Sequence, residues 1–120
     1  MQFMVYDPNI DPETFKEEDL PSPEVMEEMG NFIDEAMKAG VLVATGALQE
    51  QGTRLQMANG EFTVTDGPFI ELKELTAGFA LIDVASLEEA IEWSKRFRQI
   101  IGDGTSEIVP LWGPDSAAEH

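Results

Sequence analysis

Apolar and polar residues follow two different periods along this chain, and these periods predict its strands and helices. Residues 2–6 form a short, mostly apolar run that ends before Pro8, which predicts a strand. After Ser22, apolar residues recur every three or four positions, which predicts an amphipathic helix over about 23–39. Ser22 and Pro23 are typical of a helix start, and Gly40 is typical of a helix end.

The middle of the chain contains an apolar run and a hairpin pattern. Residues 41–48 are almost continuously apolar, which predicts a buried strand. Asn59-Gly60 is the preferred pair for a two-residue turn in which both positions need positive φ. Counting outward from this turn pairs Met57 with Phe62 and Leu55 with Val64. The predicted hairpin therefore has one apolar face and one polar face.

The last third of the chain predicts a strand, a helix and a further strand. Residues 77–84 read as a second buried strand, and Ser86 with Glu89 forms a capping box. The helix that follows carries an apolar stripe of Leu87, Ala90, Ile91, Phe97 and Ile101. Trp93 lies off this stripe, and we expect it to pack within the chain or to contact a dimer partner. Residues 107–112 contain Pro110, which predicts a strand at a sheet edge.

The order of these elements predicts an α+β fold of the ferredoxin-like type, β-α-β-hairpin-β-α-β. In this arrangement two helices cover one face of an antiparallel sheet. A second subunit that packs sheet on sheet is the economical way to cover the other face. We therefore expect a homodimer, with a single domain over 1–113 and a flexible tail over 114–120.

The composition limits the classes of partner. Seven Lys and Arg residues against 24 Asp and Glu give a net charge of −17, which disfavours nucleic acid and anionic membranes as partners. The chain has no cysteine, which excludes disulfides and thiolate chemistry and agrees with a cytoplasmic location. No apolar run approaches membrane-spanning length, so we expect neither a membrane segment nor a signal peptide.

One stretch, residues 66–74, combines a Gly-Pro pair with four charged side chains. Its residues Asp66-Gly67-Pro68-Phe69, Glu71, Lys73 and Glu74 match the pattern D-G-P-F-x-E-x-K-E. With this pattern the chain resembles the DGPF-domain proteins of the YCII-related family over about residues 2–112. The resemblance implies a dimeric α+β barrel built from two ferredoxin-like subunits.

The same resemblance implies a range of functions. Many relatives have no assigned function, some are found with sigma factors, and some YCII-like relatives are isomerase- or dehalogenase-like enzymes that act on ring lactones. In the YCII branch a His-Asp pair is the suspected catalytic centre. The single histidine of this chain is His120, at the end of the predicted tail, so that role has no matching residue here.

The lack of a second histidine also limits the chemistry that the residues themselves support. It removes Ser-His-Asp and Cys-His relays and histidine-ligated haem, and we expect no metal and no cofactor. The catalytic candidates that remain are the carboxylates Asp66, Glu71 and Glu74, any of which could transfer protons. The candidates for binding a ligand are Tyr6, Thr45, Asp66 and Lys73.

A structural reading of the same stretch competes with the functional one. Asp66 would cap a turn at Gly67-Pro68 by accepting backbone N–H bonds, and Phe69 would anchor the loop in the core. Lys73 would then pair with Glu71 or Glu74 to fix the loop.

Three functional hypotheses follow. The first is a small-molecule-binding or regulatory homodimer without catalysis, whose pocket is bordered by residues 66–74. The second is an acid–base enzyme, an isomerase or lyase, that acts on a small organic acid or lactone. The third is a structural interaction module.

The net charge generates a prediction about stability. Because like charges repel one another within the folded chain, added salt should screen this repulsion and raise the melting temperature. Thermal melts followed by circular dichroism from low to molar NaCl measure the effect. A melting temperature that does not change across this range would contradict the expectation.

Overall fold

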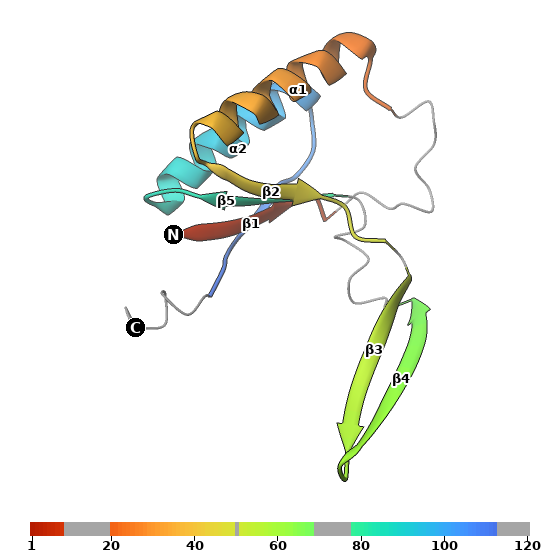
Figure 1. Cartoon of the computed structure of the whole chain (residues 1–120). Helices are drawn as coiled ribbons and strands as arrows, with labels where there is room; N and C mark the ends of the chain where they lie inside the picture. The colour runs from red at the N-terminus through yellow and green to blue at the C-terminus, as the bar shows by residue number, and fades with distance from the viewer. Residues whose placement is uncertain (9–19, 50, 69–77, 113–120) are drawn as a thin grey trace.

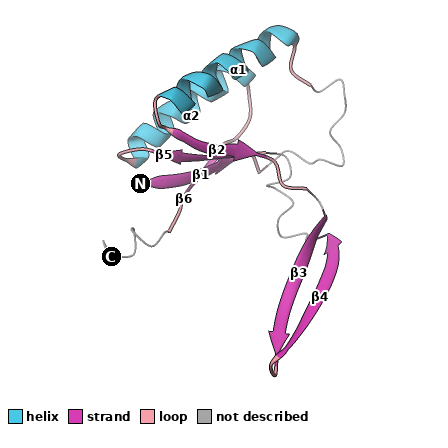
Figure 2. Cartoon of the chain, viewed as in Figure 1, coloured by secondary structure: helices cyan, strands magenta, loops and turns pink. Residues whose placement is uncertain are grey.

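A four-stranded antiparallel sheet with two helices on one of its faces forms the body of the protein, and a two-stranded hairpin extends from it (Figure 1 and Figure 2). The computed structural model describes residues 1–8, 20–49, 51–68 and 78–112. The elements are β1 (Gln2–Tyr6), α1 (Pro23–Lys38), β2 (Leu42–Gly46), β3 (Gln51–Ala58), β4 (Glu61–Pro68), β5 (Phe79–Asp83), α2 (Leu87–Ile101) and β6 (Glu107–Pro110).

The strand order confirms the ferredoxin-like prediction. The strands of the main sheet lie in the order β2-β5-β1-β6, and every neighbouring pair is antiparallel. β6 therefore lies at an edge, as Pro110 predicted. An edge strand tolerates a residue without a backbone N–H, because it has a neighbour on one side only.

Both helices begin as their sequences predict. The Ser22 hydroxyl accepts a hydrogen bond from the Val25 backbone N–H at 3.3 Å, with Pro23 at the first turn. At the start of α2, the Ser86 hydroxyl accepts from the Glu89 N–H at 3.2 Å, and the Glu89 carboxylate accepts from the Ala85 N–H at 3.0 Å. Neither α1 nor α2, the helices of the described ranges, is long and apolar enough to cross a membrane.

The core lies between the helices and the sheet. Its buried residues are Phe3, Val41, Ile82, Val84 and Ala90, which come from β1, β5, α2 and the segments next to them. Because side chains alternate along a strand, the neighbours of these core residues lie on the opposite face of the sheet.

A row of apolar residues crosses all four strands on that opposite face. Met4 follows the buried Phe3, pairs with Leu81 on one side and pairs with Val109 on the other. Leu81 in turn pairs with Ala44 at the far edge. Val109 and Ala44 are exposed. Both helices lie on the other side of the sheet (Figure 1), so no described helix covers this row.

Two expectations about burial are wrong. Residues 41–48 were expected to form a buried strand, but β2 is shorter, and all its residues after Leu42 are exposed. The reason is its position at the sheet edge, where it pairs with β5 alone. The packing expected for Trp93 is confirmed, because it packs against the core, but the predicted stripe of its helix had left it out. Leu87 and Ile91, which the stripe included, are exposed instead.

The hairpin has the predicted register. Asn59 and Gly60 have φ values of 53° and 80°, and the strands pair Met57 with Phe62 and Leu55 with Val64. The predicted turn at Gly67-Pro68 is wrong, because β4 continues through both residues, which pair with Gly52 and Gln51. Proline is tolerated there because it ends the strand.

Gly30 provides a test of the helix assignment. It lies within α1, is exposed, and an added Cβ would meet no atom within 4 Å. Gly30→Ala should therefore stabilise the protein by about 0.5–1 kcal/mol, because glycine loses more backbone entropy in a helix than alanine does. Urea denaturation measures the change, and an equal or lower free energy of unfolding would argue against it.

Candidate functional site

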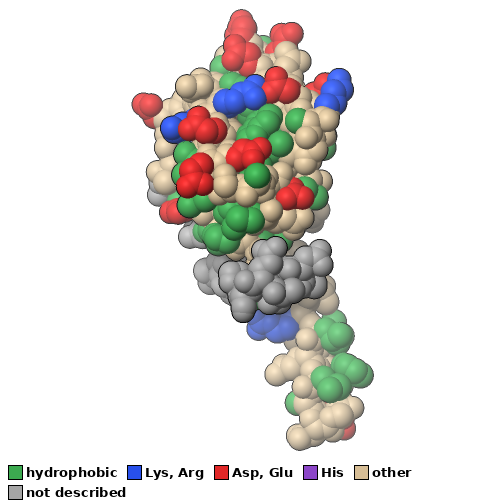
Figure 3. All heavy atoms as spheres, turned by 90° about the vertical axis from the view of Figure 1, so that its left-hand side faces the viewer, with side chains coloured by type: hydrophobic (Ala, Val, Ile, Leu, Met, Phe, Trp, Pro, Cys, Tyr) green, Lys and Arg blue, Asp and Glu red, His purple; other side chains and the backbone are tan. Residues whose placement is uncertain are grey.

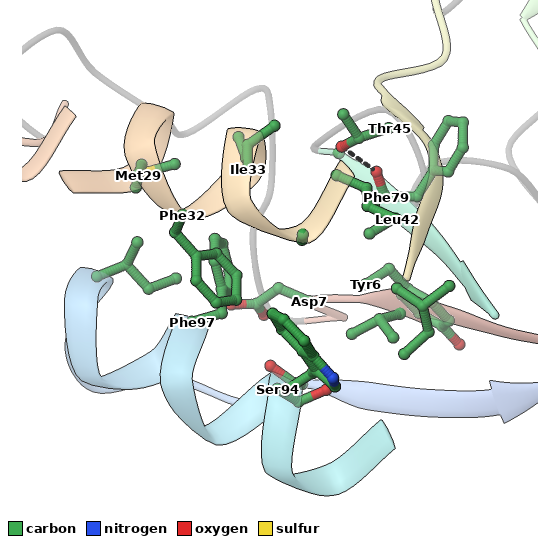
Figure 4. Close-up of a pocket in the computed structure, with 18 of the residues that line it drawn as sticks. Tyr6, Asp7, Met29, Phe32, Ile33, Leu42, Thr45, Phe79, Ser94 and Phe97 are labelled. Atoms are coloured by element: carbon green, nitrogen blue, oxygen red, sulfur yellow. Dashed lines mark hydrogen bonds between the residues drawn. The ribbon is translucent and has the colours of Figure 1, made fainter. Parts of the chain in front are cut away.

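A pocket of about 350 Å³ lies between the helices and the sheet (Figure 4). Residues of α1, α2, β1, β2 and β5 line it, and most of their lining surface is apolar. The large apolar side chains on its helical side are Met29, Phe32, Ile33, Trp93, Phe97 and Ile101. This volume and this apolar character are typical of a site for a small organic molecule.

An aromatic cluster forms the wall of the pocket between the two helices. The Phe32 ring of α1 lies 5.8 Å from the Trp93 ring and 6.4 Å from the Phe97 ring, both of α2, in tilted arrangements. The Arg96 guanidinium lies over the rings of Phe32 and Trp93, at 5.1 and 4.8 Å. Arg96 also forms an ion pair with Glu35 of α1. These contacts hold the helices together at the pocket.

An ion pair between Asp7 and Arg98 lies at the other side of the pocket. The Arg98 Nη2 atom lies 3.0 Å from the Asp7 carboxylate, and both side chains are less than 20% exposed, at 19% and 14%. Arg98 also donates from Nε to the Ser106 hydroxyl at 2.8 Å and from Nη2 to the Thr105 carbonyl at 3.1 Å. One side chain thus ties α2 to the residue after β1 and to the loop before β6.

Two of the residues that the sequence suggested for ligand binding line this pocket. Tyr6 ends β1, and Thr45 lies in β2, on the other side of the intervening strand β5. The Thr45 hydroxyl donates a hydrogen bond to the Phe79 carbonyl of β5 at 2.8 Å, as drawn in Figure 4. This bond uses the hydroxyl proton, so that Thr45 can still accept a hydrogen bond from a ligand.

Of the remaining candidates, Asp66 is the one that falls within the described residues. Asp66 lies in β4 of the hairpin and does not line the pocket; its carboxylate accepts a hydrogen bond at 2.9 Å from the hydroxyl of Thr53, its partner on β3. It therefore braces the hairpin pairing, in place of the expected turn at Gly67-Pro68. Glu71, Lys73, Glu74 and Phe69 fall outside the described residues, and so does His120.

Sequence patterns alone offered little indication that Asp7, Arg98 and Trp93 belong to the pocket. Asp7 precedes Pro8 and reads simply as the end of a strand, and its partner lies 91 positions away. Trp93 occupies a position that the simple apolar stripe leaves out, yet it faces the pocket because the buried face of α2 also includes Ser94. Phe97, by contrast, lies on the predicted stripe of α2, and Phe32 is one of the apolar residues that recur every three or four positions over 23–39.

The described ranges contain no group of three or more His, Cys, Asp or Glu residues that could hold a metal ion. Among the described residues, the charged side chains that line the pocket are Asp7 and Arg98, and these form an ion pair with each other.

Comparison with known proteins gives a family match and a relative. The family model of the YCII-related domain matches residues 1–113. The chain is 36% identical over 99 residues to an uncharacterized protein of Rhizobium meliloti (strain 1021), and this alignment covers 80% of the chain and 77% of that relative.

The Asp7–Arg98 pair generates a stability prediction. Arg98→Met should lower the free energy of unfolding by about 2 kcal/mol, because it removes the guanidinium that faces the largely buried Asp7 carboxylate. Urea denaturation measures this change. As a matched control, Lys95→Met removes the exposed ion pair with Glu92 on the same helix and should cost less than about 0.5 kcal/mol. Equal effects of the two substitutions would contradict the role given to Arg98.

Proposed function

The chain belongs to the YCII-related family, and we propose that it acts as a homodimer that binds a small, neutral, apolar molecule in the pocket between its helices and its sheet. In this proposal the protein is a binding or regulatory module. The pocket, with its apolar wall and its internally paired charges, is the observation that carries the proposal.

The chemistry of the lining favours an apolar ligand. Phe32, Trp93 and Phe97 offer ring faces and edges, on which a flat or cyclic molecule packs well. Arg98 directs its Nε and Nη2 atoms to Asp7, Ser106 and Thr105. An acidic ligand would have to compete with Asp7 for this guanidinium, and breaking a largely buried ion pair is costly.

The charge of the whole protein favours a neutral ligand as well. A net charge of −17 lowers the local concentration of anions around the protein and raises that of cations. A neutral molecule is unaffected by this field and gains the full benefit of burial in the apolar pocket.

The open face of the sheet supports the homodimer. The row of Ala44, Leu81, Met4 and Val109 gives the sheet a second apolar surface opposite the helices. Two such sheets packed face to face would bury both rows at once, which is the symmetric solution for identical chains.

The alternative function is that of an acid–base enzyme, and one observation supports it. Gly78 and Phe79 line the pocket and directly follow residues 69–77, which include Glu71 and Glu74. An enzyme of this kind would place one of these carboxylates at the pocket, where an organic acid or lactone would bind.

A pair of dyes that differ by one sulfonate tests the proposal. N-phenyl-1-naphthylamine is neutral, whereas 8-anilino-1-naphthalenesulfonate is its anionic analogue. We expect the neutral dye to bind saturably, with one site per chain, and to quench Trp93. The sulfonated dye should bind more weakly at low salt, with a difference that narrows as salt is added. Fluorescence titration measures both affinities.

Matched variants of α2 locate the dye. Ser94 lines the pocket and is buried, whereas Gln99 lies on the same helix, is exposed and does not line it. Ser94→Leu should fill the pocket and weaken binding of the neutral dye by at least about tenfold, whereas Gln99→Leu should leave it unchanged. Circular dichroism checks that both variants fold. A lack of saturable binding, or equal binding by both variants, would refute the proposed site.

A further inference from the structure

The β3–β4 hairpin presents an apolar face that nothing in the described part of the chain covers. Leu55, Met57, Phe62 and Val64 are 65–67% exposed, although they are among the larger apolar side chains of the protein. The register pairs Leu55 with Val64 and Met57 with Phe62, so the four side chains form one continuous surface. Figure 3 shows hydrophobic side chains gathered on the hairpin where it extends from the body.

This arrangement is unfavourable for a single chain in water. An isolated two-stranded hairpin is only marginally stable, and it needs a third strand or another surface against its apolar face. The opposite face is polar, with the Thr53–Asp66 hydrogen bond and Arg54, Gln56, Thr63 and Thr65 in register. The alternation thus prepares one face for burial and the other for solvent.

The position of the hairpin identifies the surface that would cover it. The helices lie on one side of the main sheet, and the hairpin runs away from the sheet on the other side (Figure 1). The apolar row through Met4 and Leu81 faces that same side. A molecule that covers the sheet would therefore lie next to the hairpin, and the apolar hairpin face could bury itself against it.

Charge favours a second copy of this chain as that molecule. Arg54, Glu61 and Asp66 are the charged residues between positions 51 and 68, so this segment contributes only −1 to the net charge of −17. Acidic side chains are scattered over the body in Figure 3, and few are seen on the hairpin. Two strongly acidic copies repel each other least where their surfaces are nearly neutral.

Size also favours a dimer that uses both surfaces. Stable interfaces bury about 800 Å² on each partner. Four side chains of a narrow hairpin are too few to bury such an area by themselves. One row of side chains across the sheet is also too small to bury it alone. In a two-fold dimer each hairpin contacts the other copy, so that the hairpin contact occurs twice.

We propose that the β3–β4 hairpin is a dimerisation arm, whose face of Leu55, Met57, Phe62 and Val64 packs against a second copy seated on the open face of the sheet. This inference rests on the proposed homodimer and adds the part of each chain that reaches across to its partner. Without the partner, the arm would expose its apolar face.

Substitutions of neighbouring residues on opposite faces of β4 test the arm. Phe62 lies on the apolar face and Thr63 on the polar face. Substituting glutamate at either position adds the same charge, but to opposite faces of the hairpin. Phe62→Glu should raise the dissociation constant of the dimer by at least about 30-fold, the effect of losing a buried interface side chain. Thr63→Glu should change it by less than about threefold. Sedimentation velocity over a concentration series of the full chain measures both constants.

Dye-labelled single-cysteine variants give a second measurement, which remains informative even if a variant is slightly less stable. Because the chain has no cysteine, Met57→Cys and Gln56→Cys each carry a single thiol for an environment-sensitive dye. The dye at position 57 should shift its emission to the blue in the dimer and back to the red on dilution, whereas the dye at position 56 should not shift. Equal behaviour at both positions would contradict the arm.

The outcomes separate the arm from the dimer on which it rests. If the unaltered chain sediments as a dimer and Phe62→Glu and Thr63→Glu dissociate alike, the arm is refuted and the dimer stands. If the unaltered chain sediments as a monomer, the dimer and the arm are both refuted.

Discussion

The packing of α1 and α2 on one face of the four-stranded sheet is the interaction on which the rest of the structure depends. It buries Phe3, Ile82 and Ala90 and makes the core of the body. Because both helices lie on this face, the opposite face depends on something else for cover. Among the described residues, the apolar row through Met4 and the hairpin face that includes Phe62 are surfaces that this packing leaves open. The proposed second copy follows from this one-sided arrangement.

The same packing also creates the pocket. The helices contact each other through Phe32, Trp93 and Phe97, and Arg96 reinforces this contact through the two rings and through its ion pair with Glu35. These large rings keep the helices together and leave space beneath them, against the sheet. In a protein with seven Lys and Arg residues, Arg96 serves this helix contact, and Arg98 ties α2 to Asp7 and to the loop before β6. Positive charge is therefore used for structure, and the pocket retains its apolar character.

Local sequence patterns predicted most of the fold, but they could not predict pairings between residues far apart in the sequence. The Asn59-Gly60 turn fixed the hairpin register, and Pro110 placed β6 at an edge, because both signals act within a few residues. The Asp7–Arg98 pair joins positions far apart in the sequence, and no periodicity encodes it. The apolar run 41–48 was misleading for a related reason. A continuous apolar run predicts a buried strand, but it does not show that β2 lies at the sheet edge, where it pairs with β5 alone.

The central claim is that a second copy of this chain covers the apolar surfaces that the helices leave open. Sedimentation equilibrium of the full chain tests this claim most directly, because it yields a mass that does not depend on shape. The account predicts a mass of twice the 13.3 kDa of one chain. A mass of 13.3 kDa at every concentration tested would contradict it, because the sheet face and the hairpin face would then be stable in water without a partner.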